Sequence, residues 1–181
     1  MTSDGTATYY NAPVIGGSPA SPNEGIAVAH DGSVWVTSLG HNAIYRVDPK
    51  DGTFTKFDIS TPGSQPGQIT RGPGGALWFT MFAAQKIGRI TTQGVITEYA
   101  QKLIGLHGIA ADANDAIWYT AMDGLGRIDA TTGRVRSFAC QGRGGLTLGP
   151  DGHMWVLGDG EMSVVRASTE GAKARVRSAG S

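Results

Sequence analysis

The residues of this chain that are best suited to proton transfer are its four histidines, and His107 stands apart from the rest. It lies in the segment LHGI, whereas His30, His41 and His153 lie in or beside expected turns without the spacing of metal ligands. An imidazole titrates near neutral pH, so His107 could act as a general acid or base. By residue type alone, it could equally be a surface histidine bonded to a neighbouring carbonyl.

Carboxylates and soft apolar side chains fall at related positions of the chain. A hard cation such as Mg²⁺ prefers several oxygen ligands. The carboxylates placed to contribute are Glu24, Asp123 and Asp159. Met81, Phe82 and Met122 could form an apolar floor suited to aromatic ligand groups, or could simply pack in the core. Glu24 could likewise be a solvated carboxylate, so the metal ligands stay open at this point.

These residues belong to a repeat marked by tryptophan. Trp35, Trp78, Trp118 and Trp155 each end a similar frame: DGSVW, GGALW, NDAIW and DGHMW. Each is followed by an arginine frame and then by glycine with an alternating run: IYRV and GTFTKF in the first copy, IGRI and GVITEY in the second, LGRI and GRVRSF in the third, VVRA and GAKARV in the fourth. We expect each tryptophan to lie in the second strand of its copy and to wedge between neighbouring copies.

The elements that must position the chemistry are short antiparallel strands. The chain has 28 glycines in 181 residues, and its Asp-Gly, Gly-Gly and Asn-Asp pairs suit tight turns between strands. Four strands in every ~40 residues are typical of a β-propeller blade. We therefore predict an all-β fold, a β-propeller of four-stranded antiparallel blades with four repeat units. The predicted single domain, 1–181, has blades over approximately 24–59, 66–101, 107–140 and 144–178, with an additional outer strand over 4–10.

Propeller geometry predicts where side chains from different blades meet. The start of each first strand and the end of each second strand lie at the same end of the blade, near the central axis. The predicted starting positions are Glu24, Gly67, His107 and Gly144, and the ending positions are Leu39, Phe82, Met122 and Asp159, with Met81 and Asp123 beside them. This rim is therefore the predicted ligand site.

The segments GPGGALWFT (72–80) and QKIGRITTQGVITEY (85–99) resemble the blade repeat of the virginiamycin B lyase family, also called streptogramin B lyases. The resemblance extends over essentially the whole chain. Members of this family are seven-bladed propellers that open streptogramin B antibiotics, which are cyclic depsipeptides, by Mg²⁺-dependent elimination at the lactone ester. The resemblance thus implies a partial or minimal relative of a seven-bladed propeller.

The resemblance also implies roles for particular residues. His107 matches the catalytic histidine of a Pro-His-Gly-Ile motif in the family. The rim geometry, rather than the resemblance, places Glu24, Met81, Phe82, Met122 and Asp123 as the residues that would contact a cyclic peptide substrate. Two glutamates that serve the metal in the family correspond here to Gly105 and Met122, and Asp123 is displaced by one position. Mg²⁺ is thus the cofactor that the family implies, without its usual ligands.

The leading functional hypothesis is a carbon–oxygen lyase that inactivates an antibiotic. The alternative is a non-catalytic propeller that binds a peptide or protein partner through its central rim, which Gly105 and Met122 favour. A gluconolactonase-like metal hydrolase is a third possibility, but the rim lacks the Glu, Asn and Asp residues that it would need in every blade. Whether the chain is an enzyme is therefore left open by the sequence.

The charge balance and the hydropathy of the sequence argue against some classes of binding partner. Lys plus Arg and Asp plus Glu are both 15, and a balanced charge argues against nucleic acid or an anionic membrane as the main target. No long apolar stretch or signal peptide is visible, and the single cysteine, Cys140, cannot form an intrachain disulfide, so the expected location is the cytoplasm. Unpaired blade flanks predict self-association, with a homodimer that completes a larger ring; the competing outcome is four blades that close on themselves.

Overall fold

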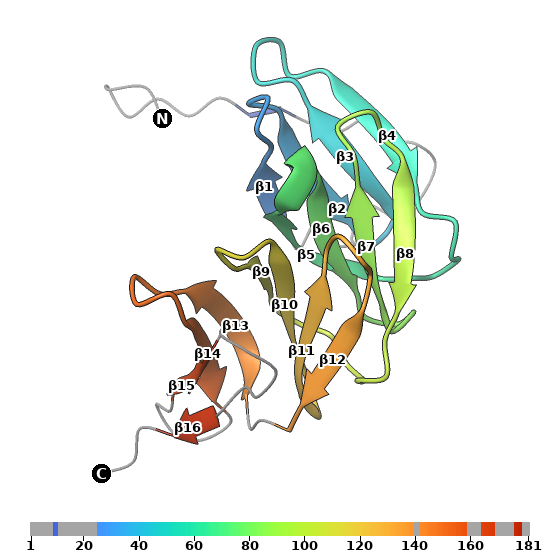
Figure 1. Ribbon diagram of the computed structural model, residues 1–181. Coiled ribbons are helices and arrows are strands. Elements are labelled where there is room, and N and C mark those ends of the chain that lie inside the picture. The colour runs from blue at the N-terminus through green and yellow to red at the C-terminus, as the bar shows by residue number, and fades with distance from the viewer. Residues whose placement is uncertain (1–8, 11–24, 140–141, 159–163, 169–175, 179–181) are drawn as a thin grey trace.

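A computed structural model describes residues 9–10, 25–139, 142–158, 164–168 and 176–178. They form four antiparallel sheets of four strands each, and strands follow one another in chain order across every sheet (Figure 1). The first two sheets contain β1 (Ile26–Val28), β2 (Val34–Ser38), β3 (Ala43–Val47), β4 (Phe54–Asp58), β5 (Pro66–Arg71), β6 (Leu77–Met81), β7 (Lys86–Ile90) and β8 (Ile96–Ala100). The last two contain β9 (Ile109–Ala111), β10 (Ala116–Ala121), β11 (Gly124–Asp129), β12 (Val135–Phe138), β13 (Gly142–Leu148), β14 (Met154–Gly158), β15 (Val164–Ala167) and β16 (Val176–Ser178).

The blades form an open arc. Figure 1 shows β1, β5, β9 and β13 along its inner edge and β4, β8 and β12 on the outer side. The propeller architecture predicted from the repeats is confirmed, although the first and fourth sheets do not meet. Within the described residues, no helix has the length and apolarity needed to cross a bilayer.

The N-terminal prediction lies mostly outside the described residues. Residues 4–8 of the predicted outer strand are not described, and Tyr9 and Tyr10 are not in a strand. The ring of Tyr10 lies against Gly52, in the turn between β3 and β4 of the first blade. An outer strand over 4–10 therefore stays a prediction.

Tight turns between the first two strands of each blade use left-handed backbone. Gly32 has φ 82° in the first blade, and Asp115 has φ 57° at the same repeat position in the third. Glycine adopts this conformation without steric cost, and aspartate is among the few other residues that tolerate it. The variable turn sequence thus keeps one geometry.

Tryptophan side chains fill the spaces between successive blades. Trp35 packs with residues of the second blade, Trp78 with the third and Trp118 with the fourth, and all three are at most 1% exposed. Each also stacks on an aromatic ring of its own outer strand: Phe57, Tyr99 and Phe138 respectively. Trp155 occupies the same place in β14 but is only half-buried. The predicted position is confirmed for all four, and the predicted burial for three.

Three of the four indoles donate a hydrogen bond from Nε1, each in a different way. Trp35 donates to Ser33 Oγ (2.8 Å), Trp118 to Asp112 Oδ2 (2.8 Å) and Trp155 to Asp151 Oδ1 (3.1 Å). The Nε1 of Trp78 is buried with no partner among the described residues. In its blade the corresponding positions hold Gly72, Gly74 and Ala76, which have no polar side chain.

The connection between the first and second blades is anchored by side chains. Asn42 Nδ2 donates to the carbonyls of Ile59 and Thr61, and Glu98 on β8 accepts hydrogen bonds from Ser60, Thr61 and Lys86. Burial raises the pKa of Glu98, but these hydrogen bonds outweigh it and lower the pKa to about 2. Glu98 is therefore a charged residue of the second blade that holds the connection from the first blade by hydrogen bonds.

Candidate functional site

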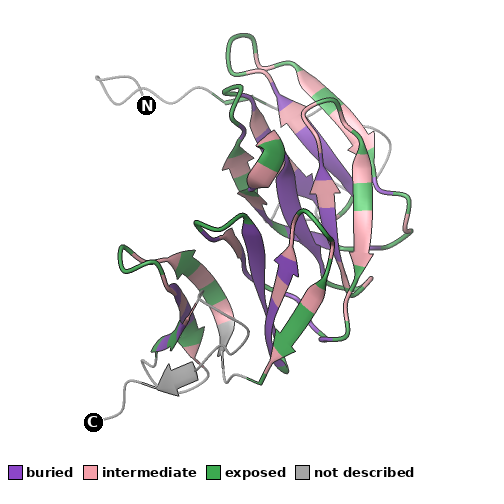
Figure 2. Ribbon diagram, in the orientation of Figure 1, coloured by how far each residue is buried: buried purple, intermediate pink, exposed green. Residues whose placement is uncertain are grey.

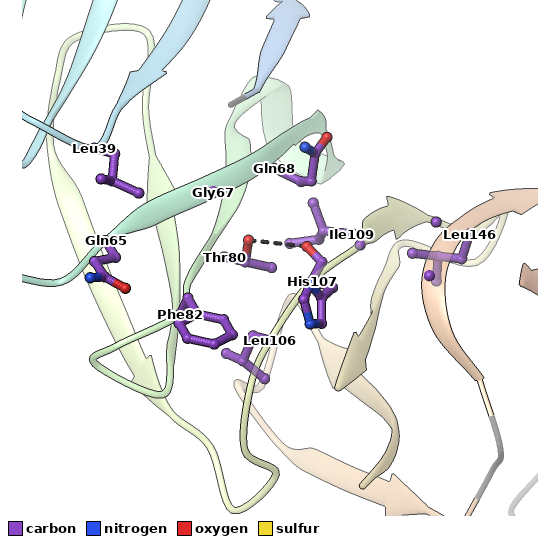
Figure 3. A pocket seen from close by; sticks show the side chains of 13 residues that line it. Leu39, Gln65, Gly67, Gln68, Thr80, Phe82, Leu106, His107, Ile109 and Leu146 are labelled. Carbon is purple, nitrogen blue, oxygen red and sulfur yellow. Dashed lines mark hydrogen bonds between the residues drawn. The ribbon is translucent and has the colours of Figure 1, made fainter. Parts of the chain in front are cut away.

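A pocket of about 660 Å³ lies on the inner edge of the arc, where strand ends of all four blades converge (Figure 3). Its volume is in the range of small-molecule sites. The lining residues are Leu39, Gln65, Gly67, Gln68, Thr80, Phe82, Leu106, His107, Gly108, Ile109, Gly144, Gly145 and Leu146. Five of the predicted rim positions are in this set: Leu39, Gly67, Phe82, His107 and Gly144.

His107 presents its imidazole to this pocket while its backbone is fixed. Its N–H donates to the carbonyl of Thr120 (2.9 Å), and its carbonyl accepts from Thr80 Oγ1 (3.2 Å). The residue is exposed, and no hydrogen bond to the imidazole occurs among the described residues. The backbone is thus held by two blades, and both ring nitrogens remain available to a ligand.

Phe82 contacts the histidine ring directly. The two rings meet edge to face, with centroids 5.7 Å apart and planes inclined at 63° (Figure 3). Phe82 is 41% exposed, so its other surface faces the pocket. The aromatic ring limits the positions that the imidazole can adopt and offers an apolar surface to a bound group.

Met122 and Asp123 support the loop that leads to His107. The N–H of Met122 donates to the carbonyl of Ile104 (2.9 Å), and Asp123 Oδ1 accepts from the N–H of Ile104 (3.0 Å). Gly105 has φ 63°, and the Met122 side chain packs over it, so a larger residue would displace that side chain. Neither Met122 nor Asp123 is among the residues that line the pocket. Both residues thus hold the loop that leads to His107, and their contact with a ligand stays a prediction.

Met81 takes the second of the two roles expected of it, packing in the core. Its side chain is fully buried in the core between the first two blades, with Leu77 and Phe79. Side chains alternate along a strand, so Thr80 faces the pocket and Met81 faces away from it. Met81 thus contributes to packing instead of forming a pocket floor.

The carboxylates of the predicted rim do not gather into a cation site in the part of the chain that is described. Glu24 and Asp159 lie outside the described residues, as does Cys140. Among the residues that are described, no group of three His, Cys, Asp or Glu side chains is arranged to hold a metal ion. The side chains of the lining offer one imidazole, two amides and the hydroxyl of Thr80 but no carboxylate, which does not fit the shell of charged oxygen ligands that Mg²⁺ prefers.

The pocket contains polar residues that the repeat analysis missed. Gln65 and Gln68 lie on either side of Gly67 near the start of β5, and Thr80 lies near the end of β6 (Figure 3). Gln65 has φ 52° and precedes the irregular pairing between Pro66 and Ile69, which an analysis based on regular strands does not anticipate. Thr80 could have been found, because threonine recurs two residues after Trp35, Trp78 and Trp118.

Comparison with known proteins identifies the family. The sequence profile of the Virginiamycin B lyase family matches residues 1–177. The chain belongs to this family. A virginiamycin B lyase from Nocardia farcinica is 32% identical over 149 residues, which are 81% of this chain and 52% of that protein. The chain therefore spans about half the length of this relative.

Solved structures agree with the assignment. Selenomethionine-substituted virginiamycin B lyase from Staphylococcus aureus is 30% identical, with a TM-score of 0.78 over 87% of this chain and 55% of its own. A catalytically inactive histidine-to-alanine variant of the S. aureus enzyme, solved with quinupristin, is 30% identical, with a TM-score of 0.76 over 86% and 55%. A putative gluconolactonase at 17% identity and a TM-score of 0.63, over 86% and 62%, shares the fold alone.

Proposed function

We propose that the inner pocket binds a cyclic depsipeptide of the streptogramin B class and that His107 opens its lactone by elimination. The single observation that supports this most is His107 itself, an exposed histidine on a rigid backbone in the pocket of a virginiamycin B lyase relative. The inactive lyase variant solved with quinupristin lacks a histidine, which supports a catalytic role for histidine in this family. The outcome would be inactivation of an antibiotic.

The proposed step is a proton abstraction coupled to carbon–oxygen cleavage. A neutral His107 nitrogen takes the proton from the Cα of the residue whose side chain forms the ester. The electrons of that C–H bond form a carbon–carbon double bond, and the ester carbon–oxygen bond breaks. The carboxylate leaves with the electron pair, and His107 holds the proton until it returns to solvent. No water is consumed, which separates elimination from hydrolysis.

The remaining pocket residues would bind and orient the ring. Phe82 offers an apolar face beside the imidazole, where an aromatic side chain of the ligand can stack. Gln65 carries an amide group that can donate hydrogen bonds to ester or peptide carbonyls. Because Mg²⁺ does not fit the described lining, no step is assigned to it.

The test is the mass of the product formed from quinupristin. Elimination gives a linear product of unchanged mass that absorbs as a dehydroamino acid, whereas hydrolysis adds the mass of one water. We expect the unchanged mass, and we expect His107→Ala to abolish its formation. Turnover by His107→Ala at the wild-type rate would remove His107 from the mechanism.

His30→Ala is the matched control, because His30 is exposed in the turn between β1 and β2, away from the inner pocket. We expect it to retain wild-type turnover. Parallel reactions with added Mg²⁺ or with a chelator test the cofactor separately. If wild-type protein binds quinupristin by calorimetry without any turnover, the alternative of a non-catalytic rim replaces the lyase proposal.

A further inference from the structure

In three of the four blades, a carboxylate lies beside the tryptophan and the recurring arginine. The fourth blade shows the arrangement most directly. Asp151 accepts hydrogen bonds from Trp155 Nε1 (3.1 Å) and from Arg166 Nε (2.7 Å). The hydrogen bond from Arg166, together with that from Trp155, lowers the pKa of Asp151 well below its usual value. The indole and the guanidinium therefore hold an ionised carboxylate between them.

The third blade reaches the same arrangement from another position of its turn. Asp112 Oδ2 accepts from Trp118 Nε1 (2.8 Å) and pairs with Arg127 Nε at 3.8 Å. Its other oxygen, Oδ1, accepts from the backbone N–H groups of Asn114 and Ala116. Asp112 is buried, so its charge is balanced by these donors and by the arginine.

The first blade adds a hydroxyl between the indole and the carboxylate. Trp35 Nε1 donates to Ser33 Oγ (2.8 Å), and that hydroxyl donates to Asp31. Asp31 also pairs with Arg46 at 3.5 Å. All three of these blades thus connect the indole N–H and the arginine through one carboxylate of their own.

The second blade has both donors without the carboxylate. Trp78 lies opposite Arg89 where β6 pairs with β7, just as the tryptophan and arginine of the fourth blade lie opposite each other. The turn sequences are GPGGALW and GPDGHMW, so the position of Asp151 holds Gly74. Among the described residues, Trp78 Nε1 has no hydrogen-bond partner and Arg89 forms no ion pair.

The glycines of this turn border the two donors. A Cβ placed on Gly72 would lie 2.8 Å from Trp78 Nε1. A Cβ placed on Gly74 would lie 3.9 Å from a terminal nitrogen of Arg89, with no other described atom within 4 Å apart from the adjoining residues. Both glycines line a hollow of about 290 Å³ among turns of the first three blades. A carboxylate in this hollow can therefore approach both donors without displacing a side chain of the turn.

The charges around the hollow favour an anion with a single negative charge. Arg71 and His30 line it, are exposed, and form no ion pair or hydrogen bond within the described part of the chain. Asp115 lies on the third-blade side, also exposed, and would repel a second negative charge on the ligand. A monocarboxylate therefore fits this lining better than a dicarboxylate or a phosphate.

We propose that the second blade binds the carboxylate of a small monocarboxylic acid between Trp78 Nε1 and Arg89. This is the place that the side chain of Asp151 fills in the fourth blade. The rest of the ligand would occupy the hollow beside Arg71 and His30. Gly74 and Gly75, at φ 65° and 71°, present no side chain that would oppose its entry.

This site is separate from the inner pocket and lies within the described blades. The inner pocket lies where first strands begin and second strands end, whereas the hollow lies where first strands end and second strands begin, at the opposite end of the blades. The first and third blades pack against the second, whose middle strands are largely buried (Figure 2). The inference does not depend on the proposed reaction.

The test is a titration with sodium acetate, followed by the indole N–H resonances of ¹⁵N-labelled protein, with sodium chloride at equal ionic strength as the reference. The Trp78 resonance is the one that disappears in Trp78→Phe and moves in Gly74→Asp. We expect it to shift saturably with a dissociation constant of ~10 mM, the weak affinity of so small a ligand. Acetamide, the neutral isostere, should leave it in place. A resonance that does not move, or that moves equally with acetamide, overturns the proposal.

Two variants test the two sides of the site. Arg89→Gln should weaken acetate binding about tenfold or more, because a charge-assisted hydrogen bond is lost. Arg46→Gln changes the same repeat position in the first blade, where Asp31 is already present, so this matched control should bind acetate as wild type does.

Gly74→Asp supplies the carboxylate within the chain, since aspartate tolerates the backbone conformation at this position. It should shift the Trp78 resonance without acetate and abolish the saturable response. Circular dichroism checks that each variant is folded. Wild-type affinity for acetate in folded Arg89→Gln or in folded Gly74→Asp would overturn the proposal.

Discussion

The third and fourth blades share a sequence frame but differ in how their tryptophans are covered. Trp118 is enclosed between its own Phe138 and the fourth blade, while Trp155 has no further blade against it among the described residues and is half-buried. Each of the two indoles donates to an aspartate, but Asp112 is buried, whereas Asp151, which also pairs with Arg166, is partly solvated. In a propeller, therefore, a blade's sequence provides half an interface, and its neighbour decides whether that half becomes core.

The largest expected difference between an internal and a terminal blade concerns the tryptophans themselves. Trp78→Ala should lower the free energy of unfolding by ~3–5 kcal/mol, as removal of a buried aromatic side chain does. Trp155→Ala should lower it by only about 1–2 kcal/mol, because the indole is already partly solvated. Urea denaturation of wild type and both variants measures the two losses. Equal losses would show that Trp155 is as well packed as the internal tryptophans.

The next largest effect on the free energy of unfolding is expected at Glu98, which links the first two blades by hydrogen bonds. Glu98→Gln should cost roughly 2 kcal/mol near neutral pH, since the charged carboxylate is stabilised by Lys86, Thr61 and Ser60. A lowered pKa stabilises the fold above the ordinary value of 4.5, and this contribution fades as the pH falls toward about 2. Urea midpoints of wild type and variant should therefore converge between about pH 5 and pH 2, which spans the interval between the two pKa values. Asp58→Asn, in an exposed pair with Lys56, is the control and should change little at any pH.

A smaller effect is expected at the threonine that joins the third and fourth blades. Thr120 Oγ1 donates to the Gly144 carbonyl and accepts from the Gly108 N–H, and the residue is fully buried. Thr120→Val keeps the shape and removes both bonds, so the unfolding free energy should fall by about 1–2 kcal/mol. Leu157→Thr, at the same position in the fourth blade, should change it by less than about 0.5 kcal/mol. A comparable loss in both variants would contradict the distinction between covered and open flanks.

The smallest expected effect is a gain in stability. Ala76→Ser places a hydroxyl where Ser33 accepts from Trp35 Nε1 in the first blade, so it should supply the missing partner of Trp78 and stabilise the fold by about 0.5 kcal/mol. Ala116→Ser is the matched control, because Trp118 Nε1 already donates to Asp112. Thermal unfolding of the two variants compares them directly. A gain at Ala116 equal to that at Ala76 would show that the indole bond is not its source.

Much of the fold followed from local sequence. The tryptophan and arginine frames recur at matching register, so Trp78 pairs with Arg89 as Trp118 pairs with Arg127, and the blade architecture could be predicted without a structure. The rim was also predictable in part, since first-strand starts and second-strand ends must meet at one end of a blade. His107, Phe82, Gly67, Leu39 and Gly144 were placed there for that reason and do line one pocket.

What tertiary structure alone decided is which side of a strand each side chain faces and which flank is covered. Met81 precedes Phe82 by one residue, yet it is core, because alternation along β6 turns it toward the first blade. Met122 and Asp123 hold the loop that leads to His107. The N–H of Met122 donates to the carbonyl of Ile104, and Asp123 Oδ1 accepts from the N–H of Ile104. Trp155 has the same local sequence signals as Trp35, but burial is a property of two surfaces in contact, and a repeat read along one chain specifies only one of them.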